Sequence, residues 1–144
     1  MPDINIMAID PKTRKVTFSF NLVPVRAEGV PALLQLCIKT VLTTTGKDKF
    51  SPLYGGNIRD YAKKGVFRND LSAVKADIVH MVSDAATQIK QEQLSRDLPD
   101  TEILKSMTVT SIQWNDTLDT LDVFIKVVSL AGESIEVNLA NQLR

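Results

Sequence analysis

Few residues of this chain could perform nucleophilic or acid–base chemistry. The sequence holds one cysteine, Cys37, and one histidine, His80. One cysteine and one histidine are enough for a single Cys–His pair, in which the histidine would activate the thiol for nucleophilic attack. Cys37, however, lies in an apolar run, where a free cysteine acts as a small hydrophobe, and His80 lies within a helical pattern. We therefore predict that Cys37 is buried and structural and that His80 lies on a helix surface.

Other kinds of catalytic or cofactor site lack their residues. A structural zinc site of the usual kind needs four Cys or His ligands, and this chain has one of each. A Ser–His–Asp triad would depend on His80, and no Gly-x-Ser-x-Gly turn presents a serine. Neither Gly-x-Gly-x-x-Gly nor a P-loop is present to hold phosphates. We predict no catalytic residue, no metal, no cofactor and no small-molecule substrate.

The acidic residues provide a further possibility, because a glycosidase needs two carboxylates across a sugar cleft. The chain has 17 Asp and Glu residues, so pairs are expected by chance. Glu102, Asp119 and Glu136 lie at the ends of expected elements or on their polar faces. That placement favours solvated surface carboxylates.

The charge balance indicates which classes of partner the chain could bind. The 17 basic and 17 acidic residues give a formal net charge of zero, whereas nucleic-acid and polybasic membrane binding both need a basic surface. A basic group from Lys47 to Lys64 has aromatic neighbours, but Asp48 and Asp60 interrupt it, which favours a solvated face. No apolar stretch approaches the ~20 residues that cross a bilayer. We predict neither nucleic acid nor membrane as a partner, while the neutral charge permits close self-association.

Hydrophobic periodicity predicts an α+β fold. Alternation over residues 16–22 indicates a strand of an N-terminal hairpin that starts near Ile4. A buried helix follows from Pro31 and should end within residues 43–46. A long helix then runs from about residue 71 to 94 or 98, with a polar tail beyond the core. Residues 107–114, 121–127 and 134–139 alternate as strands of an antiparallel meander. We predict two main helices packed on this meander, with residues 1–30 as a hairpin extension and linker and residues 31–144 as the main domain.

The last strand could form an exposed edge of the sheet. An open edge presents unpaired backbone groups, which are a template for a strand of another chain. The predicted partner-binding residues are Ser134, Ile135, Glu136, Val137, Asn138 and Leu139.

The segment that follows the first helix resembles a known family. It contains a Thr-rich turn that ends in glycine, followed by an aromatic, a proline, a second aromatic and a glycine: Thr43, Thr44, Gly46, Phe50, Pro52, Tyr54 and Gly55. Together with the long helix and three strands that follow, this pattern is similar to that of the gene-25-like baseplate proteins. These are sheath-initiator wedge proteins of contractile phage tails, with a counterpart in the type VI secretion baseplate. The resemblance spans Pro31 to Leu139.

The resemblance implies a structural protein that is not an enzyme. Family members surround the tail tube at the top of the baseplate, and their strands interlock with those of the first sheath ring, which templates the sheath. The implied partners are the tail sheath, tail tube and baseplate wedge proteins, with a ring of copies around the tube. The implied location is the tail baseplate of the virion, after assembly in the host cytoplasm.

The family also has a Glu-Pro-Arg motif that docks on the wedge core. Its loose match here is Pro99, Asp100 and Glu102, without the arginine, and these are the predicted wedge-docking residues. Two alternatives stay open: a small tail-associated peptidoglycan hydrolase, suggested by the acids and by an old lysozyme name in the family, and a cytoplasmic adaptor that uses the same strand edge.

Overall fold

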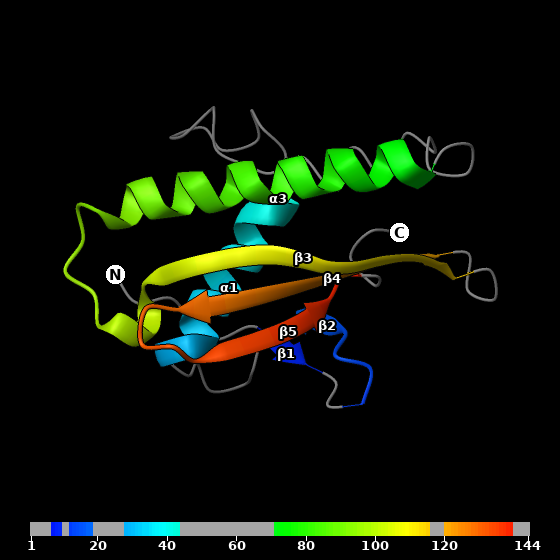
Figure 1. The fold of residues 1–144 in the computed structure, drawn as a ribbon. Helices are drawn as coiled ribbons and strands as arrows, with labels where there is room; N and C mark the ends of the chain where they lie inside the picture. The colour runs from blue at the N-terminus through cyan, green and yellow to red at the C-terminus, as the bar shows by residue number, and fades with distance from the viewer. Residues whose placement is uncertain (1–6, 10–11, 19–27, 44–70, 116–119, 140–144) are drawn as a thin grey trace.

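The computed structural model describes residues 7–9, 12–18, 28–43, 71–115 and 120–139. In chain order its elements are β1 (Met7–Ile9), β2 (Val16–Phe18), α1 (Gly29–Leu42), α3 (Leu71–Gln93), the 3₁₀ turn η2 (Asp100–Glu102), β3 (Leu104–Asn115), β4 (Thr120–Ser129) and β5 (Ser134–Asn138). The predicted α+β class is confirmed: two helices pack on a C-terminal antiparallel meander, and β1 and β2 pair as an N-terminal hairpin (Figure 1).

The sheet has the order β3-β4-β5, and each strand is antiparallel to its neighbour. In β3 the apolar residues Met107, Val109 and Ile112 are unevenly spaced, so simple alternation cannot place them on one face. A register shift between Val109 and Ser111 resolves this. Such a β-bulge adds one residue to a strand, so the side chains beyond it return to the original face. Met107 and Ile112 accordingly both belong to the core.

The two helices close the core. In Figure 1, α1 crosses behind the sheet and α3 runs along β3. The buried apolar side chains of α1 are Leu33, Leu34, Cys37, Ile38 and Val41, and those of α3 are Val74, Ile78, Val82, Ala85, Ala86 and Ile89. Both sets belong to one cluster with the inward side chains of the sheet. The long helix that the hydrophobic periodicity predicts from about residue 71 is confirmed.

α1 ends close to its predicted boundary. The helix stops at Leu42, and Thr43 adopts an extended conformation with φ −75° and ψ 131°. The Lys39 carbonyl accepts two hydrogen bonds from Thr43, one from its N–H at 3.0 Å and one from its hydroxyl at 2.6 Å, so Thr43 closes the last turn of the helix. Gly46, predicted to end this helix, lies outside the described residues.

α3 ends at Gln93, one residue before the nearer of the two predicted ends, residues 94 and 98. Its last residue, however, does not belong to a polar tail beyond the core, because the Gln93 side chain is buried. Its amide nitrogen donates to the Glu102 carbonyl and its amide oxygen accepts from the Leu104 N–H, both at 2.9 Å. One amide therefore satisfies two backbone groups at once. Periodicity missed this residue because its partners come from the tertiary structure.

A second contact ties the start of α1 to the same turn. Glu28, at the N-cap position, makes no side-chain capping bond. Instead the carboxylate of Glu102 accepts a hydrogen bond of 3.0 Å from the Gly29 N–H. The first N–H groups of a helix lack internal partners and carry the positive end of its dipole, so a carboxylate there is stabilising. The turn around η2 thus joins α1, α3 and the start of β3.

Replacing Gln93 with alanine should lower the free energy of unfolding by about 2–4 kcal/mol, because the Glu102 carbonyl and the Leu104 N–H would both lose their partner. Gln91→Ala is the matched control, since Gln91 lies on the same helix and is exposed. It should change stability by less than about 0.5 kcal/mol. Urea unfolding measures both values, and equal small effects would contradict the bridging role of Gln93.

Candidate functional site: the edges of the sheet

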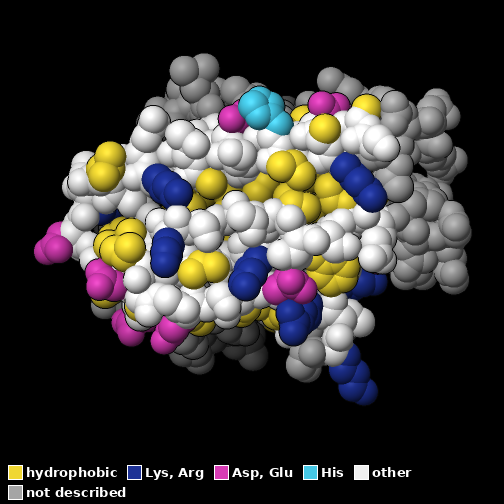
Figure 2. All heavy atoms as spheres, viewed as in Figure 1, with side chains coloured by type: hydrophobic (Ala, Val, Ile, Leu, Met, Phe, Trp, Pro, Cys, Tyr) yellow, Lys and Arg dark blue, Asp and Glu magenta, His cyan; other side chains and the backbone are white. Residues whose placement is uncertain are grey.

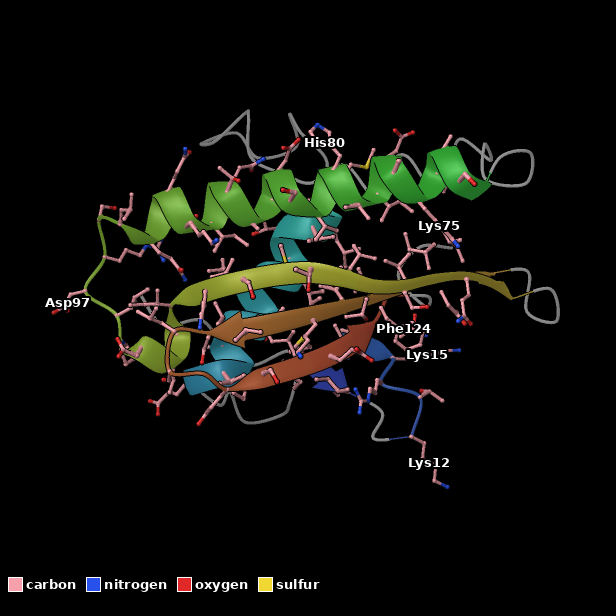
Figure 3. All side chains as sticks on the ribbon, in the orientation of Figure 1. Lys12, Lys15, Lys75, His80, Asp97 and Phe124 are labelled. Atoms are coloured by element: carbon pink, nitrogen blue, oxygen red, sulfur yellow. The ribbon has the colours of Figure 1, made fainter. Side chains whose placement is uncertain are left out.

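The candidate nucleophile and base lie apart in the fold. Cys37 is fully buried, and desolvation raises the pKa of its thiol from an ordinary 9.0 to about 12. His80 projects from α3 on the side away from the sheet (Figure 3), where its Nε2 lies 3.5 Å from Oδ2 of the exposed Asp84. The predictions of a buried cysteine and a surface histidine are confirmed. The structure does not bring these two side chains together.

The acids singled out by sequence have partners within the fold. Glu102 caps α1. Glu136 Oε1 lies 3.3 Å from Arg14 Nη1, and its Oε2 accepts a hydrogen bond of 3.0 Å from the Thr110 hydroxyl. Asp119 lies outside the described residues. Within the described ranges, no group of three or more His, Cys, Asp or Glu side chains could hold a metal ion, and no helix is long and apolar enough to cross a membrane.

Most of the loop motif behind the family resemblance lies outside the described residues, namely Thr44, Gly46, Phe50, Pro52, Tyr54 and Gly55. The same is true of the basic group from Lys47 to Lys64. Thr43 is described and ends α1. The structural role of this motif therefore stays a prediction.

The predicted wedge-docking residues lie in the turn around η2. The Pro99 carbonyl accepts from the Glu102 N–H at 2.9 Å, and the Asp100 carbonyl accepts from the Ala131 N–H at 3.3 Å. The first bond closes the turn itself, and the second holds it against the connection between β4 and β5. The Pro99 and Asp100 side chains are exposed, whereas the Glu102 carboxylate is used inside the fold. Docking on a wedge partner stays a prediction for these residues.

The predicted partner-binding strand, β5, lies at one edge of the sheet. The Leu139 N–H donates to the Val123 carbonyl at 2.9 Å, toward β4. Successive residues of a strand point their backbone groups to opposite sides, so Ser134 and Glu136 turn theirs away from β4. No described strand pairs with these two residues on the outer side. The first half of β5 is therefore an open edge within the described part of the chain.

The far end of β5 is already paired within the chain. The Asn138 N–H donates to the Arg14 carbonyl at 2.9 Å, and Lys15 forms a parallel bridge with Asn138. The structure thus narrows the predicted edge to the residues before Asn138. Hydrophobic alternation could identify β5 as a strand from sequence. It could not show that Arg14 and Lys15 lie beside this strand, because no local pattern links positions so distant in the chain.

The opposite edge of the sheet, β3, lies beside α3. The register turns the backbone groups of Val109 and Ile112 away from β4. A groove of about 400 Å³ separates this edge from α3 and is lined by Lys75, Val79, Val109, Thr110, Ser111, Ile112 and Gln113. Lys75 projects from α3 toward the sheet in Figure 3, and Figure 2 shows hydrophobic side chains between the helix and the sheet. Sequence reasoning missed the groove, since two elements distant in the chain form it.

The burial of Cys37 should make stability depend on pH. The pKa of its thiol rises from 9.0 to about 12 on folding, so the unfolded chain loses this proton first as pH rises. The stabilisation is complete below pH 9 and is lost as pH rises toward 12. Between pH 8 and pH 10, the free energy of unfolding should fall by about 1.4 kcal/mol more in the native protein than in Cys37→Ala. Urea unfolding at both pH values checks this, and equal falls in the two proteins would contradict it.

No protein-family model, curated protein or solved structure matches this chain. Its function is therefore inferred from its own residues. Cys37 is buried in the core and His80 is exposed on α3. Glu102 and Glu136 are bonded within the fold. The two sheet edges, in contrast, turn backbone groups outward, and they are the best candidate for a functional site.

Proposed function

We propose that this protein is a structural subunit of a contractile tail baseplate, which surrounds the tail tube and templates sheath assembly by strand pairing. The observation that carries the proposal is the first half of β5, where Ser134 and Glu136 turn their backbone groups outward and no strand of the described residues pairs with them. A strand added there gains backbone hydrogen bonds and a defined register. The choice of a baseplate subunit among assembly proteins rests on the sequence resemblance of residues 31–139.

The inner face of β5 suits a template. Val137 and Leu139 are fully buried and Ile135 packs against the core. These side chains hold β5 in place, so the entropy cost of pairing falls mainly on the incoming strand. Slipping β5 by one residue would turn its apolar side chains to the other face, so the register of the edge is also well defined.

The charge distribution supports close packing of copies. The 17 basic and 17 acidic residues cancel, and Figure 2 shows Lys and Arg side chains dispersed over the viewed face. Little long-range repulsion would therefore oppose a ring of copies around a tube. A contact repeated around such a ring gains stability through multivalency. The proposed partners are the sheath, tube and wedge proteins, and the proposed location is the virion tail baseplate.

The two alternatives differ in what they need. A cytoplasmic adaptor would bind its partner through the same edge of β5 but would not belong to a baseplate. Measuring sheath assembly on baseplates therefore distinguishes the adaptor from the proposed baseplate subunit. A peptidoglycan hydrolase would need a free pair of catalytic acids, whereas Glu102 and Glu136 are bonded within the fold. Digestion of cell walls by the purified protein would nevertheless favour the hydrolase.

Ser134→Pro tests the open edge of β5. Proline lacks the N–H and is tolerated at the first residue of a strand, so this change removes an outward donor and leaves the pairing with β4 intact. Baseplates that carry the variant should assemble roughly tenfold less sheath, because each copy in the ring loses a hydrogen bond worth about 1 kcal/mol. Electron microscopy of assembled tails measures the sheath yield.

Two control variants accompany this test. Ser134→Ala keeps the N–H, and Val79→Ser changes the groove at the β3 edge instead; both should assemble sheath normally. Normal sheath yield from folded Ser134→Pro would contradict strand pairing at β5. Deleting the strand is a poorer test, because Val137 and Leu139 belong to the core.

A further inference from the structure

The N-terminal hairpin lies against the closed end of β5. Lys15 bridges Asn138 in the parallel sense, and the Asn138 N–H donates to the Arg14 carbonyl at 2.9 Å. Figure 3 shows Lys15 beside the end of β5 and Lys12 farther out along the hairpin. At Asn138 the hairpin pairs with the outer side of β5, the same side to which Ser134 and Glu136 turn their backbone groups.

We propose that this hairpin is a displaceable cover of the β5 edge, which an incoming strand replaces. Pairing begins at Ser134 and Glu136, which no described strand pairs on the outer side, and extends to Asn138 as Arg14 and Lys15 leave. The inference rests on the proposed function in one respect, the choice of β5 as the edge that binds a partner.

The anchors of the hairpin are unequal. The Val16 side chain is fully buried in the core cluster, and Met7 and Ile9 of β1 pack against that cluster. The ion pair between Arg14 and Glu136 has side chains that are 54% and 30% exposed, and such a pair contributes little to stability. β1 and β2 have three residues each, and a short two-stranded hairpin is marginally stable by itself. The hairpin therefore detaches at a lower cost than the meander unfolds.

Glu136 indicates which strand replaces the hairpin. Its carboxylate faces Arg14 and also holds the Thr110 hydroxyl on β3. A strand that runs parallel to β5 with a basic residue opposite Glu136 reproduces the contacts that Arg14 makes. Charge complementarity therefore points to a basic, extended segment of a partner protein as the occupant.

Hydrogen exchange of two neighbouring amides tests the cover in the free protein. The Asn138 N–H donates to the hairpin and the Leu139 N–H donates to β4, both at 2.9 Å. If the hairpin detaches alone, Asn138 should exchange at least about tenfold faster than Leu139, after correction for intrinsic rates and without dependence on denaturant. Equal rates with equal denaturant dependence would overturn the proposal.

Arg14→Ala provides a second measurement, because it removes the ion pair and keeps the Cβ. It should speed exchange of Asn138 about two- to fivefold and leave Leu139 unchanged. Lys90→Ala, which removes an exposed charge on α3, is the matched control and should change neither amide. Equal acceleration of both amides by Arg14→Ala would overturn the proposal. Since the measurement needs no partner, its result is independent of whether sheath assembly is the function.

Discussion

The buried amide of Gln93 is the contact on which the arrangement of helices and strands depends. Its two hydrogen bonds join the end of α3 to the Glu102 carbonyl and to the first residue of β3. Glu102 in turn holds the first N–H of α1. A buried polar group is costly unless it is satisfied, so the Gln93 amide and its two backbone partners stabilise one another. These bonds orient both helices toward one sheet, where their apolar faces meet.

β5 belongs to the core and to the surface at the same time. Its inward side chains are among the most buried of the described residues. Within the same ranges its outer backbone groups meet no strand at Ser134 and Glu136 and are paired at Asn138. An open edge strand is a hazard for unwanted pairing as well as a means of assembly. Partial cover by the hairpin reconciles the two, because the edge is shortened without being lost.

The residues that match the docking motif of the gene-25-like family lie in a turn whose backbone groups bond within the fold and whose first two side chains are exposed. The backbones of Pro99 and Asp100 hold the turn through bonds with Glu102 and Ala131, while their side chains stay exposed. Glu102 is committed to α1. The acid that the resemblance selects therefore bonds inside this fold.

The sequence by itself determined the α+β order, the buried stripe of α3, the alternating strands of the meander and the contrast between buried Cys37 and exposed His80. These features follow from local periods of 3.6 and 2 residues, which every short window of sequence carries. Only the tertiary structure decided that Gln93 is buried, that Glu102 caps a helix 73 residues earlier, and that Arg14 meets Asn138. It also decided that α3 and β3 enclose a groove. Such contacts join groups that are distant along the chain and leave no periodic trace, so they exist only once the core has brought their elements together.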